Sequence, residues 1–288
     1  MKQNIIICLI LFLSYSCTED KFIEAEPQMV VEGWIDAGGY PVVMLSQIIP
    51  ASENKISTDN LKDYVINWGK VTVSDGENTV VLTGKKSDDY FPPYIYTTSK
   101  MRGEEGKTYY LTAEYKDFYV TAQTTIPKKA KIESIEIDYD NKYSINAIIN
   151  DNPEEKNYYK FFVKVIGRDS CYFYLSSNFA LIDDSDCVFP YKIPINIGES
   201  PLYDRDKKKH TISEKDKLHI KVAQIDSVMY NFWDDYKNII ELGQNPFFRY
   251  SNSIRSNISG GLGYWAGYGS TEYVCKPYAH NNPIELKK

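Results

Sequence analysis

Histidine is scarce in this sequence, with three residues among 288, and the sequence has none of the common catalytic motifs. No HExxH segment pairs two histidines on a helix, and no GxSxG segment presents a serine nucleophile. The five cysteines form no CxxC pair, and no cysteine and histidine spacing indicates zinc. Since no motif supplies a catalytic set, we expect a protein that works without enzymatic activity and without a cofactor.

The chain also lacks a basic excess and a membrane-spanning run. Its formal net charge is −6, from 33 basic and 39 acidic residues, and no basic stripe is present. This charge argues against nucleic acid as a partner. The apolar run Ile5–Leu13 is too short for a transmembrane helix, which needs roughly 20 apolar residues.

That apolar run instead has the features of an export signal. It follows the basic Lys2 and precedes the small residue Ser16, and Cys17 comes next. We predict that residues 1–16 are a lipoprotein signal peptide and that lipid is attached to the thiol of Cys17. The alternative is an ordinary secretory signal, in which Cys17 has no special role.

The segment around Cys17 indicates where the protein is carried. A strict lipobox has Leu three residues before the cysteine, whereas Ser14 stands there and Leu13 lies one residue further back. This looser pattern resembles lipoproteins of Bacteroidetes-type bacteria, and the acidic residues 18–20 resemble their surface-export tag. We expect residues 17–27 to be a lipidated tether and the protein to sit on the outer membrane at the cell surface.

The first hundred residues after the tether predict strands. Tyrosine is abundant, with 25 residues, and aromatic residues make up 14% of the chain, which suits half-buried strand faces. About seven short strands lie between turn signals such as Gly38-Gly39 and Asp75-Gly76. We predict a mostly β protein in which residues 28–127 form an immunoglobulin-like β-sandwich.

A boundary at Pro127 introduces a second β-rich domain over residues 128–288, with residues 183–217 rich in loops. One amphipathic helix is predicted at about 227–242. Asp226 or Ser227 can cap its start, and Gly243 can end it. The helical spacing of its apolar residues indicates a face that packs on the core.

Tryptophan is the candidate for ligand contact because it combines a large apolar ring with a polar group. Trp34, Trp68 and Trp265 are the candidate contact residues. Each has the alternative of a place in the hydrophobic core. The sequence alone does not separate these two uses.

Two weaker signals lie in the second domain. Cys171 and Cys187 flank a turn-rich segment, and export makes a disulfide between them feasible. Asp183, Asp184 and Asp186 offer oxygen ligands to calcium, although the glycine and distal glutamate of an EF-hand are missing. A solvated acidic loop is the alternative.

Several segments together resemble one family, the bacterial lipoproteins that carry domain of unknown function 4249. The resemblance runs from the anchor to about residue 275 and depends on the order of its segments rather than on one motif. These segments are Val30-Val31-Glu32-Gly33-Trp34-Ile35, Val71-Thr72-Val73-Ser74-Asp75-Gly76, Gly106-Lys107-Thr108-Tyr109-Tyr110-Leu111, Pro127, Tyr230 to Tyr236, and Asn257-Ile258-Ser259-Gly260-Gly261-Leu262-Gly263. The family has no settled activity, and the resemblance implies a partnership with TonB-dependent outer-membrane transporters.

We therefore expect an outer-membrane lipoprotein that binds a nutrient ligand or assists a TonB-dependent transporter without catalysing a reaction. A structural or adhesive surface protein is one alternative. A surface glycan hydrolase is another, because such enzymes need only two carboxylates held at a set separation. The sequence does not say which of its acidic residues are close in space.

Overall fold

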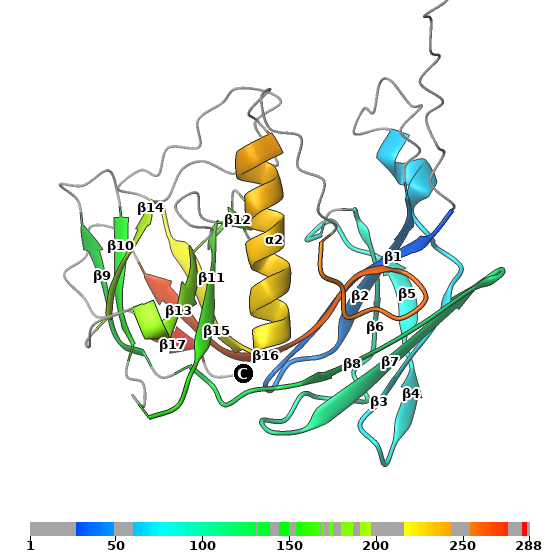
Figure 1. Ribbon diagram of the computed structural model, residues 1–288, viewed down its shortest axis with the longest axis horizontal. Helices are drawn as coiled ribbons and strands as arrows, with labels where there is room; N and C mark the ends of the chain where they lie inside the picture. The colour runs from blue at the N-terminus through cyan, green and yellow to red at the C-terminus, as the bar shows by residue number, and fades with distance from the viewer. Residues whose placement is uncertain are drawn as a thin grey trace, which may run out of the picture.

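The computed structural model confirms a mostly β protein with a single α-helix among the residues it describes (Figure 1). No helix in this part of the chain is long and apolar enough to cross a bilayer. The described residues are 27–48, 60–90, 92–130, 132–138, 144–149, 154–167, 169, 173–174, 180–186, 191–196, 216–243, 254–275 and 284–286.

A ten-stranded sheet runs through both halves of the chain. Its order is β12-β11-β15-β16-β1-β2-β6-β5, with β13 paired to β11 and β17 paired to β16. The strands are β1 (Met29–Asp36), β2 (Val42–Gln47), β5 (Thr83–Lys86), β6 (Tyr94–Thr97), β11 (Tyr158–Val165), β12 (Phe173–Tyr174), β13 (Leu181–Asp183), β15 (Leu218–Ile225), β16 (Leu262–Cys275) and β17 (Ile284–Leu286).

Two smaller antiparallel sheets accompany the long one. The first has the order β4-β3-β7-β8 and the second the order β14-β10-β9. Their strands are β3 (Lys70–Ser74), β4 (Thr79–Val81), β7 (Thr108–Tyr115), β8 (Phe118–Thr125), β9 (Ile132–Asp138), β10 (Ser144–Ile149) and β14 (Tyr191–Asn196), and the 3-10 helices are η1 (Asn60–Tyr64) and η3 (Asp184–Asp186).

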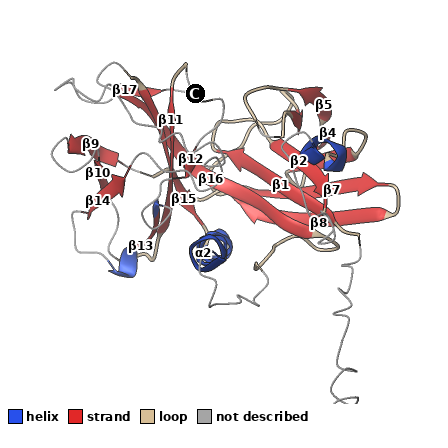
Figure 2. Ribbon diagram, turned by 90° about the horizontal axis from the view of Figure 1, so that it is seen from above, coloured by secondary structure: helices blue, strands red, loops and turns tan. Residues whose placement is uncertain are grey.

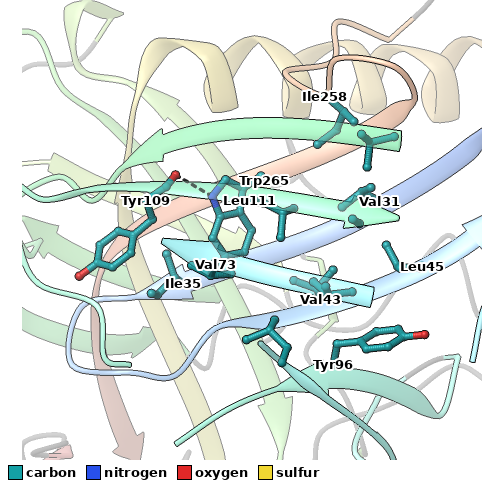
Figure 3. Packing of buried hydrophobic residues seen from close by; sticks show 14 of the residues in the cluster. Val31, Ile35, Val43, Leu45, Val73, Tyr96, Tyr109, Leu111, Ile258 and Trp265 are labelled. Atoms are coloured by element: carbon teal, nitrogen blue, oxygen red, sulfur yellow. Dashed lines mark hydrogen bonds between the residues drawn. The ribbon is translucent and has the colours of Figure 1, made fainter. Parts of the chain in front are cut away.

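The four-stranded sheet packs face to face on the N-terminal half of the long sheet. Strand β1 alternates buried and less buried residues, so Val31 and Ile35 point into the core. From the opposite sheet, Val73 and Leu111 fill the same space (Figure 3). This layering is a two-sheet sandwich, and its immunoglobulin-like character remains a prediction.

Strand β16 joins the two halves of the molecule (Figure 2). Its first part pairs parallel to β1, from Leu262 opposite Val30 to Tyr268 opposite Asp36. Its second part pairs antiparallel to β15 and ends at Cys275, a buried free thiol. The predicted boundary between residues 127 and 128 therefore does not coincide with a break in the sheet.

A second core lies between the C-terminal half of the long sheet and the three-stranded sheet. Phe161 and Val163 of β11, Val222 of β15 and Tyr273 of β16 are buried there. Ile149 of β10 meets them from the opposite sheet. Each face of β11 is therefore covered, because its other face lies towards the helix.

The helix α2 (Ser227–Gly243) confirms the predicted helix to within one residue at its end. The Asp226 carboxylate accepts a hydrogen bond from the Met229 backbone N–H at 2.8 Å, which caps the first turn. Met229, Phe232 and Trp233 are buried against the long sheet. The helix thus covers the face of β11, β15 and β16 that is turned away from the second core.

The prediction that residues 183–217 are rich in loops is wrong for two segments. Asp184–Asp186 forms η3, and Tyr191–Asn196 forms β14, which pairs with β10 over its whole length. Pro194 lies within β14, and Pro is tolerated in an edge strand, as β14 is in its sheet. The short strand β17, which pairs with β16, was also not predicted.

Candidate functional site

A buried ionic cluster, formed by Asp36, Lys160, Lys221 and Ser270, lies on the helix-facing side of the long sheet. Because side chains alternate along a strand, β1, β15 and β16 direct Asp36, Lys221 and Ser270 to this one face. The Lys221 ammonium lies 2.6 Å from Asp36 Oδ1, and the Ser270 hydroxyl donates to the same oxygen at 2.8 Å. All four side chains are buried.

Aromatic rings surround the two lysines of the cluster. Lys221 Nζ lies 4.6 Å from the ring centroid of Tyr268 and 5.2 Å from that of Phe162. Lys160 Nζ lies 5.1 Å from the Trp233 ring and 5.3 Å from the Phe162 ring. Ring faces attract a cation, while burial lowers the pKa of Lys160 to about 7.

A half-buried carboxylate in the middle of β1, that of Glu32, shows the opposite shift of pKa. Burial raises the pKa of Glu32, and the Tyr264 hydroxyl donates to Glu32 Oε1 at 2.9 Å. Glu32 and Asp36 are four residues apart on one strand, a rise of about 13 Å. Glycosidases hold their two carboxyl groups roughly 5–9.5 Å apart. The backbone rise between these two acids exceeds that separation, which argues against a catalytic pair of that kind.

One further polar pair lies beside the cluster on the same face. His219 Nε2 and Glu272 Oε2 are 2.9 Å apart, and both side chains are largely buried. Together with Lys221 and Asp36, this pair links three neighbouring strands, β15, β16 and β1. The arrangement is suited to holding the strands in register, because each carboxylate faces a basic group.

Two of the acidic residues predicted to bind calcium, Asp183 and Asp184, are engaged within the protein, and the calcium site stays a prediction. Asp183 accepts a hydrogen bond from the Ser185 N–H at 3.0 Å and lies 3.1 Å from Lys156 Nζ. Asp184 accepts from the Asn157 N–H at 2.6 Å. The side chain of Asp186, the third predicted ligand, is not among those that the structure describes. Nowhere among the described residues do three His, Cys, Asp or Glu side chains gather closely enough to hold a metal.

The three candidate tryptophans have different surroundings. Trp265 is fully buried, and its Nε1 donates to the Tyr109 carbonyl at 3.1 Å, so its prediction as a surface contact is wrong (Figure 3). Trp34 is half-buried, with its ring centroid 6.0 Å from that of Tyr90. Trp68 is 89% exposed and is the one of the three that is open to a partner.

Three other predicted residues lie outside the described part of the chain. They are the lipidation residue Cys17 and the candidate disulfide partners Cys171 and Cys187. The lipid anchor and the disulfide stay predictions.

An exposed sheet surface was missed by the sequence reasoning. This surface is the side of the sheet β4-β3-β7-β8 that is turned away from the sandwich core, and we call it the outer face. Its exposed large residues are Val81, Tyr110 and Tyr119. Val81 and Tyr119 are 60% exposed, and Tyr110 is 45% exposed. The signal was the alternation in β7, where Tyr109 is buried and Tyr110 points outward.

Threonines fill the middle of this outer face. The register places Val81 opposite Thr72, Thr72 opposite Thr112, and Thr112 opposite Thr121. The edge of β8 is bridged at Thr121, whose backbone exchanges hydrogen bonds of 3.0 Å and 2.8 Å with Ser259. The side chains of the face, rather than the β8 edge, are therefore available for contact.

The buried lysine was also missed. Lys160 stands inside the largely apolar run Tyr158–Val165, where a lysine between two aromatic residues was the available signal. Lys221 alternates with buried residues of β15 in the same manner. Only the pairing of β15, β16 and β1 brings Lys221 to Asp36.

The fold defines a mostly β protein whose four-stranded sheet exposes two tyrosines on its outer face. The chain matches the family described as Domain of unknown function (DUF4249) over residues 17–273, and it belongs to this family. A comparison with curated proteins finds no match.

Proposed function

We propose that the protein is a surface-anchored outer-membrane lipoprotein that serves as a non-catalytic binding or accessory partner of a TonB-dependent nutrient transporter. The export signal and Cys17 support the anchor. The family match begins at residue 17, where the mature chain is predicted to start. In this account the protein captures a nutrient or covers the transporter by surface contact.

The observation that carries the proposal is the outer face of the four-stranded sheet. Tyrosine contributes strongly to protein interfaces because its rigid ring buries much area at little entropic cost. Tyr110 and Tyr119 stand on a sheet that is held from behind by the sandwich core. A partner would therefore meet aromatic groups that are already fixed in position, with threonine hydroxyls between them.

The buried ionic cluster supports the same account in a different way. Lys221, Asp36 and Ser270 link β15, β1 and β16, and the side chains of the cluster are buried rather than displayed. We assign this cluster to the stability of the sheet. The surface contact is then made by the outer face, whose exposed residues lie on other strands than those of the cluster.

The experiment that tests the proposal is affinity purification of the tagged, full-length protein from gently solubilised outer membranes. We expect a TonB-dependent channel to be recovered in near-stoichiometric amount, as identified by mass spectrometry. A Cys17→Ala variant, grown with a labelled fatty acid, should lose the label and leave the membrane fraction. Recovery of the wild-type protein without a channel would contradict the transporter partnership and favour adhesion or free binding.

A further inference from the structure

Strand β1 begins at one end of the sandwich, which we call the leading end, and Trp68 lies there. The Gln28 carbonyl accepts a hydrogen bond from the Ile48 N–H at 3.1 Å. Val30 is opposite Ser46, and Ser46 forms a bridge with Val65. The segment that carries Trp68 is therefore two strands away from the point where the chain enters the fold, and η1 lies beside the start of β1 (Figure 1).

The backbone around Trp68 is held firmly while its side chain is exposed. Tyr96 donates its hydroxyl hydrogen to the Ile66 carbonyl at 2.7 Å and accepts the Gly69 N–H at 2.8 Å. The Tyr94 hydroxyl donates to the Asn67 carbonyl at 2.9 Å. Two tyrosines thus fix the turn on both sides of an indole that is 89% exposed. Such a side chain loses little backbone entropy when it is buried by a partner.

Other exposed apolar groups share the leading end. Leu262, which pairs with Val30, is exposed at the start of β16. Tyr119 stands at the corner between the leading end and the outer face. These segments are in contact, since a Cβ on Gly261 would lie 2.6 Å from the Met29 carbonyl and 2.8 Å from Val120.

Among the described residues of the leading end, the exposed charges are balanced in number. Lys70 pairs with Glu114 at 3.0 Å, so this pair adds no net charge. The other described lysines of this end are matched in number by described acids beside them. The exposed basic residues are Lys62, Lys70 and Lys116, and the acidic residues beside them are Asp63, Glu114 and Asp117. A partner that binds here is therefore selected by the aromatic and aliphatic groups rather than by net charge.

We propose that the leading end rests on the lipid surface that holds Cys17, with the Trp68 ring at the level of the headgroups. This inference depends on the lipid anchor proposed above. The ten residue steps from Cys17 to Pro27 reach at most about 35 Å, which limits how far the leading end can be from the bilayer. The opposite end of β1 lies about 23 Å along the strand from its start.

The chemistry of the leading end suits a bilayer interface. Indole has an apolar ring and an N–H donor, and tryptophan is enriched where one side of a group is apolar and the other wet. A single such residue binds lipid weakly by itself. The anchor turns its contact into an intramolecular one at high effective concentration, so a weak contact is enough to orient the protein.

The test is quenching of tryptophan fluorescence in the lipidated, full-length protein. The protein is reconstituted into phosphatidylcholine vesicles, with or without a lipid that carries a nitroxide near the headgroup. We expect nitroxide lipid to quench the wild-type emission at least twofold more than that of the Trp68→Phe variant. Trp34→Phe is the matched control and should keep the wild-type quenching, because it leaves Trp68 in place.

Vesicle flotation separates the possible failures. Equal quenching of wild type and Trp68→Phe in protein that floats would overturn the lipid contact at the leading end while leaving the anchor intact. Protein that does not float would overturn the anchor and this inference together. Capture of a transporter is measured independently, so neither result depends on that partnership.

Discussion

The ammonium of Lys221 lies 2.6 Å from Asp36 Oδ1, which joins β15 of the C-terminal half to β1 of the N-terminal half across β16. Both side chains are largely buried, and Ser270 donates to the same carboxylate oxygen. Breaking a buried ion pair costs about 3–5 kcal/mol, because the remaining charge stays in a poorly solvated place. We expect Asp36→Asn to lower the free energy of unfolding by this amount, measured by urea denaturation at neutral pH.

Two controls accompany this prediction. Asp88→Asn removes one partner of the exposed Lys86–Asp88 pair, at 3.5 Å, and should change stability by less than about 1 kcal/mol. Adding Lys221→Met to Asp36→Asn should recover part of the loss, since it removes the stranded charge. An Asp36→Asn variant as stable as wild type would show that the pair does not hold the two halves together.

Lys160 gives a pH dependence whose direction follows from its burial. Burial lowers its pKa to about 7 in the folded protein, from the ordinary lysine value of 10.5. Between these values the unfolded chain binds a proton that the folded protein does not, so stability rises with pH from about 7 to 10.5. The slope from this one group is at most about 1.4 kcal/mol per pH unit.

The Lys160→Met variant should lose this rise and gain more stability at pH 7 than at pH 10. The Lys160→Arg variant keeps its positive charge throughout this pH range and should be less stable than wild type at both pH 7 and pH 10. Denaturant unfolding at pH 6–10 measures the three profiles. Parallel profiles for wild type and Lys160→Met would mean that the buried amine does not titrate in this window.

Substitution of Trp265 tests whether strand β16, which lies late in the sequence, is part of the N-terminal core. Its ring is fully buried among residues of both sheets of the sandwich. We expect Trp265→Ala to cost about 3–5 kcal/mol, as is usual for removal of a large core aromatic. Trp68→Ala, at an exposed position, should change stability by no more than about 0.5 kcal/mol. Similar unfolding midpoints for the two variants would contradict the packing of β16 against β1.

Gly33 tests the same packing from β1. A Cβ at Gly33 would lie 2.9 Å from Trp265 Cε3, which is closer than side-chain carbons normally approach. We expect Gly33→Ala to cost about 1–3 kcal/mol by overpacking. Gly76→Ala is the comparison, because that position has φ +92° but no neighbouring atom within 4 Å. Its cost should come from backbone strain alone, and thermal unfolding of the two variants separates these effects.

Local patterns predicted the local elements well. The strands over Thr108–Tyr115 and Phe118–Thr125 follow from alternation and a tight turn, and the helix follows from its cap and apolar spacing. Both signals act within a few residues of the chain. They are therefore visible without knowing which distant segments meet.

Long-range pairing was not predictable in the same way. No local signal states that β16 pairs parallel to β1, yet this pairing buries Trp265 and brings Lys221 and Ser270 to Asp36. Likewise, composition could not separate Trp68 from Trp265, since exposure depends on what packs against each ring. The edge strand β14 was missed because Pro194 interrupts its pattern.

The central claim, a surface lipoprotein that partners a TonB-dependent transporter, is tested most directly by comparative capture from the outer membrane. Tagged wild type, a Val81→Ser/Tyr110→Ser variant of the outer face and a Val228→Ser control are purified in parallel. Val228 is exposed on α2, away from the outer face. We predict that wild type and the control recover the channel in near-stoichiometric amount and that the outer-face variant recovers at least fivefold less. Recovery of all three without a channel would contradict the account, and equal recovery of the channel by all three would place the contact elsewhere on the protein.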